Sequence, residues 1–319
     1  MIGEGEFSVG GRASQLRTLA MKENPAPLPR PPTMLTLLFD GVAYGMLLFV
    51  LAVGLAVTLG LMNFINLAHG AFAMAGGYIT VLLMNRAGVP FLLCLPAAFI
   101  GTALLGALLE RTLYRPMYAR PHLDQVLFSL GLVFMAVTAV DYTLGSMQQN
   151  ITLPVWLQGR LPIEAVGIGK YRLFIIVLCA ALTLGLQWVL SRTRFGSRLR
   201  ASVDDPRVAG GLGLDVNRIF MFTFAVGSGL AGLGGALGAE VLGLDPTFPL
   251  KFMIYFLIVV SVGGTTTITG PLVAALLLGV ADVAGKYYVP KLGAFIVYTL
   301  MIAILVWRPQ GLFAKAGGR

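Results

Sequence analysis

Charged residues are scarce in this chain. They make up 12% of its 319 residues, about half of the roughly 25% found in soluble domains, whereas hydrophobic residues make up 57%. Apolar windows of about 20 residues, the length that crosses a bilayer, recur along almost the whole chain. The composition predicts an all-α polytopic membrane protein. No tract remains that is long enough for a separate soluble domain, which excludes an ATPase or ligand-binding domain in this chain.

Cysteine and histidine are rare, with two residues of each. Cys94 and Cys179 lie inside apolar segments and lack metal-ligand spacing, so we expect small core residues and no disulfide. His69 and His122 are far apart, and the sequence contains no nucleophile with a base, no paired catalytic carboxylates and no phosphate loop. We therefore expect neither catalysis nor a metal or cofactor bound by this chain.

The net charge of +9 would suggest nucleic-acid binding in a soluble protein, but here the basic residues orient the chain in a membrane. Loops 110–125 and 191–218 and the C-terminal tail carry an arginine excess, which marks the cytoplasmic side. The longer loop 146–172 is then outside. This assignment predicts a cytoplasmic C-terminus and no nucleic-acid partner.

Nine apolar segments are candidates for membrane helices. Segment 64–84 separates two topologies: a full span gives nine crossings with the N-terminus outside, and a re-entrant segment gives eight with the N-terminus inside. Both topologies stay open at this point. The segments are 37–61, 64–84, 91–109, 126–145, 173–190, 219–242, 252–269, 271–288 and 292–307.

Residues 1–33 differ from everything that follows. They hold glycine, serine, charges and a proline-rich run, a composition that cannot bury a core. We expect a disordered N-terminal extension, with Met34, directly before the first apolar segment, as an alternative start of translation. Residues 34–313 then form one transmembrane domain, and residues 314–319 form a cytoplasmic tail.

Three hydrogen-bonding side chains interrupt the apolar run near its first segment. Asn63, Asn66 and His69 are spaced by three residues, so all three would share one face if a single helix continued through them. Polar groups at bilayer depth need partners from protein or from a water-lined path. The pattern predicts either a substrate path or gate, or a satisfied hydrogen-bond site between helices.

Glycines dominate another apolar segment. Residues 227–232 match the pattern G-x-G-x-x-G, but a dinucleotide site needs a preceding strand and an acidic residue about 20 positions later. Further glycines follow within the same apolar run. Small residues spaced by three or four let two membrane helices approach closely, so we interpret this segment as a helix-packing surface.

Loop 191–218 combines basic residues with small ones. Asp204, Asp205 and Pro206 form a typical helix start, with proline at the first helical position, and glycines follow Ala209. We predict a short helix over 206–211 that lies along the membrane surface and docks onto a cytoplasmic partner. The alternative is a solvated, positively charged loop. The candidate docking residues are Arg194, Gly196, Arg200, Asp204, Asp205, Pro206, Ala209 and Gly213.

Acidic residues inside apolar segments are few. Asp40 and Glu240 lie near segment ends, whereas Asp141 and Asp282 are deeper, with no basic neighbour expected in their own segments. An ionisable group in a span is a functional candidate, so a proton-coupled secondary transporter that uses Asp141 and Asp282 is the competing function. We see no inverted internal repeat, which such transporters often contain.

Three motifs resemble a known family. Residues 60–72 contain N-F-I-N-L-A-H-G-A-F, loop 191–218 ends in G-L-G-L-D before Asn217 and Arg218, and the chain closes with W-R-P-Q-G-L-F over 307–313. In this order they resemble the permeases of branched-chain amino acid ABC importers, and the first permease of the pair in particular.

The resemblance implies a multi-pass subunit of the bacterial inner membrane. It implies as partners a second permease, two cytoplasmic ATPases that bind the ATP, a soluble substrate-binding protein and membrane lipids. Loop 191–218 would couple ATP hydrolysis to transport. Permeases for urea and short amides share the same motifs, so the substrate does not follow from them.

One stretch departs from the family pattern. The family commonly has a G-G-x-G-[ST] stretch before its late spans, where this chain has three consecutive threonines, Thr265, Thr266 and Thr267. Their hydroxyls are candidates for the substrate path or gate, or for partners of a helix break.

Overall fold

The computed structural model describes residues 33–309 and 311–313 except for 63, 162–167 and 265–266. The candidate residues Asn63, Thr265 and Thr266 therefore lie outside the described residues, as do almost all of the N-terminal extension and the C-terminal tail. In the described part, regular structure is helical apart from two isolated bridges.

Nine helices of 15 residues or more lie in the described part, and each coincides with one of the predicted apolar segments. Their bounds are α2 Met34–Met62, α3 His69–Ala87, α4 Phe91–Leu109, α5 His122–Leu144, α6 Lys170–Arg192, α9 Val216–Leu242, α10 Phe248–Gly263, α11 Thr269–Tyr288 and α12 Gly293–Trp307.

Five shorter helical pieces connect them. A π-helical turn and a 3-10 turn follow α4, another 3-10 turn follows α5, and two short α-helices separate α6 from α9. These pieces are η1 Glu110–Tyr114, η2 Arg115–Met117, η3 Val155–Leu157, α7 Arg194–Asp204 and α8 Pro206–Gly211.

Six helices of the described chain are long and apolar enough to cross a membrane: α2, α4 with its extension, α5, α6, α9 and α11. Two shorter apolar helices are α10 and most of α12. The 16 residues of α10 reach about 24 Å at 1.5 Å per residue, less than the roughly 30 Å of hydrocarbon. The all-α polytopic architecture is confirmed, and by this criterion it has fewer full-length spans than the eight or nine expected.

Helix α2 forms the centre of the bundle. Of its membrane-spanning window 89% is buried, and it contacts α11, α9, α6 and α10. Residues Leu47 to Val53 are buried without a break. An apolar helix can be enclosed by other helices or by lipid, and α2 is enclosed by other helices along most of its length.

Helix α9 packs through its glycines, as predicted. A Cβ atom at Gly232 would lie 2.1 Å from the Thr102 hydroxyl of α4, and one at Gly235 would lie 1.8 Å from the Ala73 carbonyl oxygen of α3. No side chain fits either contact, so the glycines set the closeness of three helices. Cys94 and Cys179 are free and buried, also as predicted.

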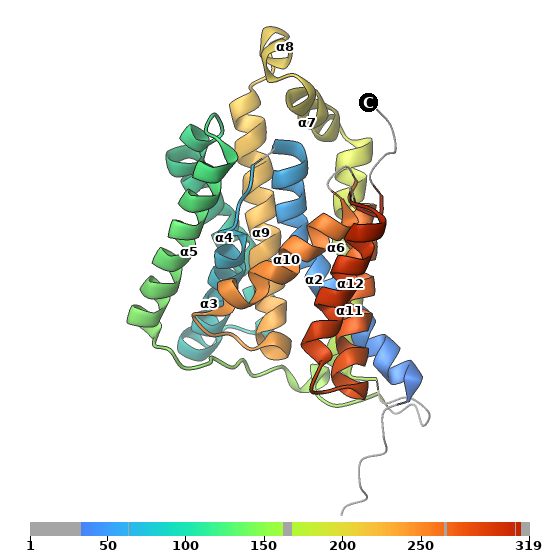
Figure 1. The fold of residues 1–319 in the computed structure, drawn as a ribbon. Helices are drawn as coiled ribbons and strands as arrows, with labels where there is room; N and C mark the ends of the chain where they lie inside the picture. Colours follow the sequence, from blue (N-terminus) through green and yellow to red (C-terminus); the bar gives the residue numbers. More distant parts are fainter. Residues whose placement is uncertain (1–32, 63, 162–167, 265–266, 310, 314–319) are drawn as a thin grey trace, which may run out of the picture.

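The two ends of the bundle differ (Figure 1). Helices α7 and α8 extend beyond one end, and the connection from α4 to α5 turns at the same end. The beginning of α2, the long connection after α5 and the turn between α11 and α12 lie at the opposite end. The two arginine-rich loops are therefore on one side and the described residues of loop 146–172 are on the other, in agreement with the grouping made from charge.

Candidate functional sites

The connection from α2 to α3 is not helical. Helix α2 ends at Met62, α3 begins at His69, and residues 64–68 form an irregular segment inside the bundle. Phe64, Asn66 and Ala68 are all buried. The shared face stated for the case of one continuous helix does not arise, because residues 64–68 are irregular and their backbone bonds to another helix.

Two side chains of α5 bind the backbone of this segment. The Ile65 N–H donates to Gln125 Oε1 over 3.2 Å, and the Leu67 N–H donates to Ser129 Oγ over 3.2 Å. Gln125 also donates to the Arg120 carbonyl oxygen at 3.0 Å. Gln125 and Ser129 are buried and lie one helical turn apart. Their spacing of four in an otherwise apolar run was the sequence signal, and it was overlooked.

Asn66 anchors the segment to the end of α4. Its Oδ1 accepts a hydrogen bond of 3.1 Å from the Tyr114 hydroxyl of η1. Its Nδ2 is buried and has no hydrogen-bond partner among the described residues. Tyr114 packs in turn against Phe64 and Phe224, with ring centroids 5.4 and 4.7 Å apart.

His69 points to different neighbours. Its Nε2–H donates to the Leu51 carbonyl oxygen of α2 over 2.9 Å, and since a carbonyl oxygen only accepts, Nε2 carries the hydrogen. The ring lies edge-on to Phe256 of α10 at 6.3 Å. A Cβ at Gly54 would lie 2.6 Å from His69 Cε1, so glycine makes room for the ring. His69 thus joins the beginning of α3 to α2 and α10.

Thr267 belongs to another connection, between α10 and α11. It is exposed, and its hydroxyl accepts hydrogen bonds of 3.3 Å from the Gly270 N–H and the Thr269 hydroxyl. The Thr267 hydroxyl therefore accepts from a free N–H group in the first turn of α11. The C-terminal motif closes this connection, because the Leu312 N–H donates to the Val262 carbonyl oxygen over 2.8 Å.

Helix α7 is fixed against the end of α6. The Thr193 hydroxyl caps α7 by accepting from the Gly196 N–H, and the Arg200 guanidinium donates to the Leu190 carbonyl oxygen. A Cβ at Gly196 would lie 2.1 Å from that oxygen. Gly196 and Arg200 therefore hold α7 in place, whereas the Arg194 side chain is exposed.

Helix α8 spans Pro206–Gly211, as predicted. Asp205 Oδ1 caps it by accepting from the N–H groups of Arg207 and Val208 at 2.9 and 3.0 Å. Within α8, Ala209 is buried and Pro206 is exposed, as is Asp204 before the helix.

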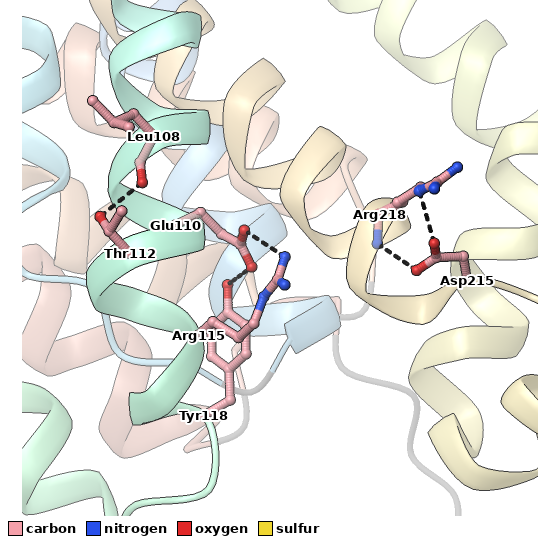
Figure 2. A network of polar contacts seen from close by, with 7 residues as sticks. All are labelled: Leu108, Glu110, Thr112, Arg115, Tyr118, Asp215 and Arg218. Carbon is pink, nitrogen blue, oxygen red and sulfur yellow. Dashed lines mark hydrogen bonds and ion pairs between the residues drawn. The ribbon is translucent and has the colours of Figure 1, made fainter.

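The exit from α8 uses a glycine and a second aspartate. Gly213 has a φ of +85°, which favours glycine. Asp215 then caps α9 by accepting from the Arg218 N–H and pairs with the Arg218 side chain at 2.8 Å (Figure 2). Val208 and Leu212 remain 58% and 77% exposed at the tip.

An ion pair with a buried carboxylate lies at the end of α4 and was missed by the sequence analysis. Glu110 is fully buried and accepts from Arg115 at 3.3 Å and from the Tyr118 hydroxyl at 3.2 Å (Figure 2). The same short π-helix supplies Tyr114, the partner of Asn66. The signal was an acid at the end of an apolar run with an arginine five residues later.

Two of the four intramembrane acids, Asp40 and Asp282, have basic partners that the sequence analysis did not find. Asp282 is buried and pairs with Lys286 over 2.6 Å, one helical turn along α11, so the expectation that Asp282 has no basic neighbour in its segment is wrong. Asp40 pairs with Arg172 of α6. Asp141 is exposed near the end of α5, and its carbonyl oxygen accepts a hydrogen bond from the Gly145 N–H beyond the helix. No group of three His, Cys, Asp or Glu residues suited to a metal is found among the residues described.

Comparison with known proteins identifies the family of this chain. Residues 37–305 match the family of permease components of branched-chain amino acid transport systems. The chain belongs to this family. It is therefore a transport subunit and not an enzyme, and the predicted resemblance is confirmed.

Its relatives favour the first permease type. The chain is 27% identical to the high-affinity branched-chain amino acid permease BraD of Pseudomonas aeruginosa, over 87% of this chain and 95% of BraD. It is 25% identical to LivH of Escherichia coli over 87% and 94% of the two chains. The match to LivM of E. coli, at 27%, covers only 68% of that longer permease.

Proposed function

We propose that this chain is the permease subunit of an ATP-driven importer of branched-chain amino acids in a bacterial inner membrane. It pairs with a second permease, two cytoplasmic ATPases and a soluble substrate-binding protein. The family match and the names of BraD and LivH support this assignment. The ATP is bound by the ATPases and not by this chain.

The exposed apolar tip of α8 carries the proposal. Val208 lies in α8, and Leu212 is its C-cap residue, whose N–H donates to the Val208 carbonyl oxygen at 3.0 Å. Both side chains are exposed. Exposed apolar side chains on a short, firmly capped element are suited to a protein partner. We assign this surface to the ATPases.

Movement of α8 has a direct route into the bundle. Helix α7 buries Leu199 and Ser202 and contacts α6, α9 and α2. Helix α8 in turn contacts α7 and α9. A displacement of α8 by the ATPases is thereby transmitted to α9, which packs on α3 and α4, and to the central helix α2.

The topology that we propose has nine crossings. Residues 64–68 together with α3 make one broken crossing, which continues from the α7–α8 end of α2 toward the opposite end (Figure 1). The beginning of α2 is then outside and the C-terminus cytoplasmic. The arginine excess near α7 and α8 supports this orientation.

The broken crossing is the proposed gate. Asn66 binds it to η1, and His69 binds it to α2 and α10, so relative movement of these helices must change both contacts. Half-helices with irregular backbone commonly line binding sites in transporters. Asn63 and the threonines Thr265, Thr266 and Thr267 stay predictions for this path.

The test is to replace the apolar tip of α8. Val208→Asp with Leu212→Asp should leave the complex assembled in the membrane while lowering leucine uptake and binding-protein-stimulated ATP hydrolysis at least tenfold. Val208→Ile with Leu212→Met is the matched control and should behave like wild type. Undiminished stimulated hydrolysis in the double aspartate variant would refute the coupling role, and uptake of urea in place of leucine would refute the substrate class.

A further inference from the structure

A cavity of about 360 Å³, lined by both charged and apolar residues, lies near the end of the bundle opposite α7 and α8. Its charged lining comes from the beginnings of α2, α6 and α10 and from the last turns of α11. The beginning of α2 lies at this end (Figure 1). The charged residues are Asp40, Arg172, Lys251, Asp282 and Lys286. In the proposed topology the cavity faces the side from which substrate arrives.

The charges are layered by depth. The side chains of Asp282 and Asp40 are 2% and 16% exposed, whereas those of Arg172, Lys251 and Lys286 are 44% to 56% exposed. The acids therefore form the floor of the cavity and the bases form its rim. A ligand with a cationic and an anionic end would enter with the cationic end first.

The charges also balance. Asp40 pairs with Arg172, Asp282 with Lys286, and Lys251 with Asp245 just outside the lining. Three acids and three bases sum to zero. Because an uncompensated charge in a partly desolvated site is costly, a neutral zwitterion suits this cluster better than a cation or an anion of the same size.

Two features of the floor are suited to an ammonium group. Asp40 Oδ1 is buried and has no hydrogen-bond partner among the described residues. The ring of Tyr44 already holds one cation, with Lys286 Nζ 5.7 Å from its centroid, and aromatic faces attract ammonium groups. Leu47, Ile175 and Phe252 supply apolar wall.

We infer that this cavity binds a free amino acid as a zwitterion. The α-ammonium contacts Asp40 and Asp282, the α-carboxylate contacts the basic rim, and an aliphatic side chain packs on the apolar wall. The volume is at the small end of the range of about 300–1,000 Å³ for ligand pockets, which suits one amino acid. This inference rests on the proposed function and adds a binding site to it.

Saturation-transfer NMR on the whole importer in nanodiscs, without nucleotide or binding protein, tests the inference. The probes are L-leucine, 4-methylpentanoate, which lacks the amine, and 3-methylbutylamine, which lacks the carboxylate. We expect leucine to bind at least tenfold more tightly than either analogue. Asp40→Asn with Asp282→Asn should weaken leucine binding at least tenfold and reduce its advantage over 4-methylpentanoate.

A second variant covers the case in which the double asparagine variant does not assemble. Val283→Phe fills the cavity and keeps every charge, and it should also abolish leucine binding. Lys291→Gln removes an exposed base from the turn between α11 and α12, outside the lining, and should change nothing. Equal affinity for the three probes, or unchanged leucine binding in the filled cavity, would overturn the inference.

ATP-driven uptake measured on the same samples separates the two proposals. Leucine uptake by a wild-type importer whose cavity binds no leucine would overturn the binding site and leave the proposed function standing. Absence of leucine uptake by the wild type would overturn the proposed function itself.

Discussion

Two interruptions of helical structure in this protein are stabilised in opposite ways. The segment between α2 and α3 is buried, and its backbone bonds to Gln125 and Ser129, which lie some 60 residues away along the chain. The α7–α8 element extends beyond the bundle, and Thr193 and Asp205 cap its two helix starts. Asp215 caps the start of α9, and each of the three caps lies directly before its helix.

The difference follows from the solvent. Water satisfies whatever a cap leaves unpaired at the surface, so a local aspartate or threonine is sufficient there. Inside the bundle no water is at hand, and each free N–H needs a side chain delivered by another helix. The buried break therefore depends on tertiary packing, and the surface element depends on its own sequence.

The most damaging substitution should be one in the distant partners of the buried break. Gln125→Leu leaves the Ile65 N–H and the Arg120 carbonyl oxygen without their partner, and orphaned buried polar groups cost about 1–3 kcal/mol each. We expect a clear fall in the melting temperature of the purified permease.

Thr143→Val is the matched control on the same helix. Thr143 is exposed, and its hydroxyl donates to carbonyl oxygens of α5 itself, those of Ala139 and Val140. Its loss should therefore change stability little. Equal melting temperatures for Gln125→Leu and wild type would show that the break does not depend on α5.

His69 gives the next largest effect and separates the bracing role from the path role. His69→Ala removes the bond to Leu51 and leaves a hole between α2 and α10. We expect a loss of about 1–3 kcal/mol, seen as a lower protein level in the membrane. His69→Gln keeps an N–H donor and should recover most of the level.

If the same segment lines the substrate path, its side chains must be accessible to water at some stage of transport. Cysteine introduced at Asn66 or His69 should react with water-soluble thiol reagents at some stage of the ATP cycle. Cysteines that stay unreactive throughout would reject the path and leave only the brace. A normal protein level with lost uptake in His69→Ala would favour the path.

A change in α8 should act on coupling and not on overall stability. Ala209 is a buried residue of α8, whereas a Cβ atom at Gly210, the next residue, would meet open space. Ala209→Glu should displace the helix and reduce the uptake per ATP several-fold with an unchanged melting temperature. Gly210→Glu carries the same charge and should be close to wild type. Stimulated hydrolysis and uptake that stay normal in Ala209→Glu would contradict coupling through α8.

The same contrast explains what could be predicted. The helix over 206–211 was found to the residue, because Asp205, Pro206 and the following glycines are local signals. The nine apolar segments were found because hydrophobicity alone marks them. The helix-packing role of Gly232 and Gly235 followed from their spacing in an apolar run.

The partners of the buried break could not be predicted in the same way. Nothing near Asn66 in the sequence points to Tyr114, and nothing near Ile65 points to Gln125, because these contacts exist only after α4 and α5 have packed beside the break. The shared face of Asn63, Asn66 and His69 was stated only for a continuous helix, and the irregular residues 64–68 do not meet that condition. The ion pairs were different, since Arg115 lies five residues from Glu110 and Lys286 lies one turn from Asp282, and both were available to inspection.

The smallest effect is expected from shortening the chain at the start of α2, where a local cap begins a helix of the membrane domain. The Thr33 hydroxyl accepts from the Thr36 N–H at 3.3 Å, and its carbonyl oxygen accepts from the Leu37 N–H at 3.1 Å. A chain that begins at Thr33 keeps this cap and should insert and transport like the full chain. A chain that begins at Met34 loses it and places an ammonium group at the helix N-terminus, which costs about 1 kcal/mol. Because α2 is held along its whole length by other helices, we expect faster hydrogen exchange only in its first turn, with uptake unchanged. Failure of both shortened chains to insert would show that residues 1–32 are required.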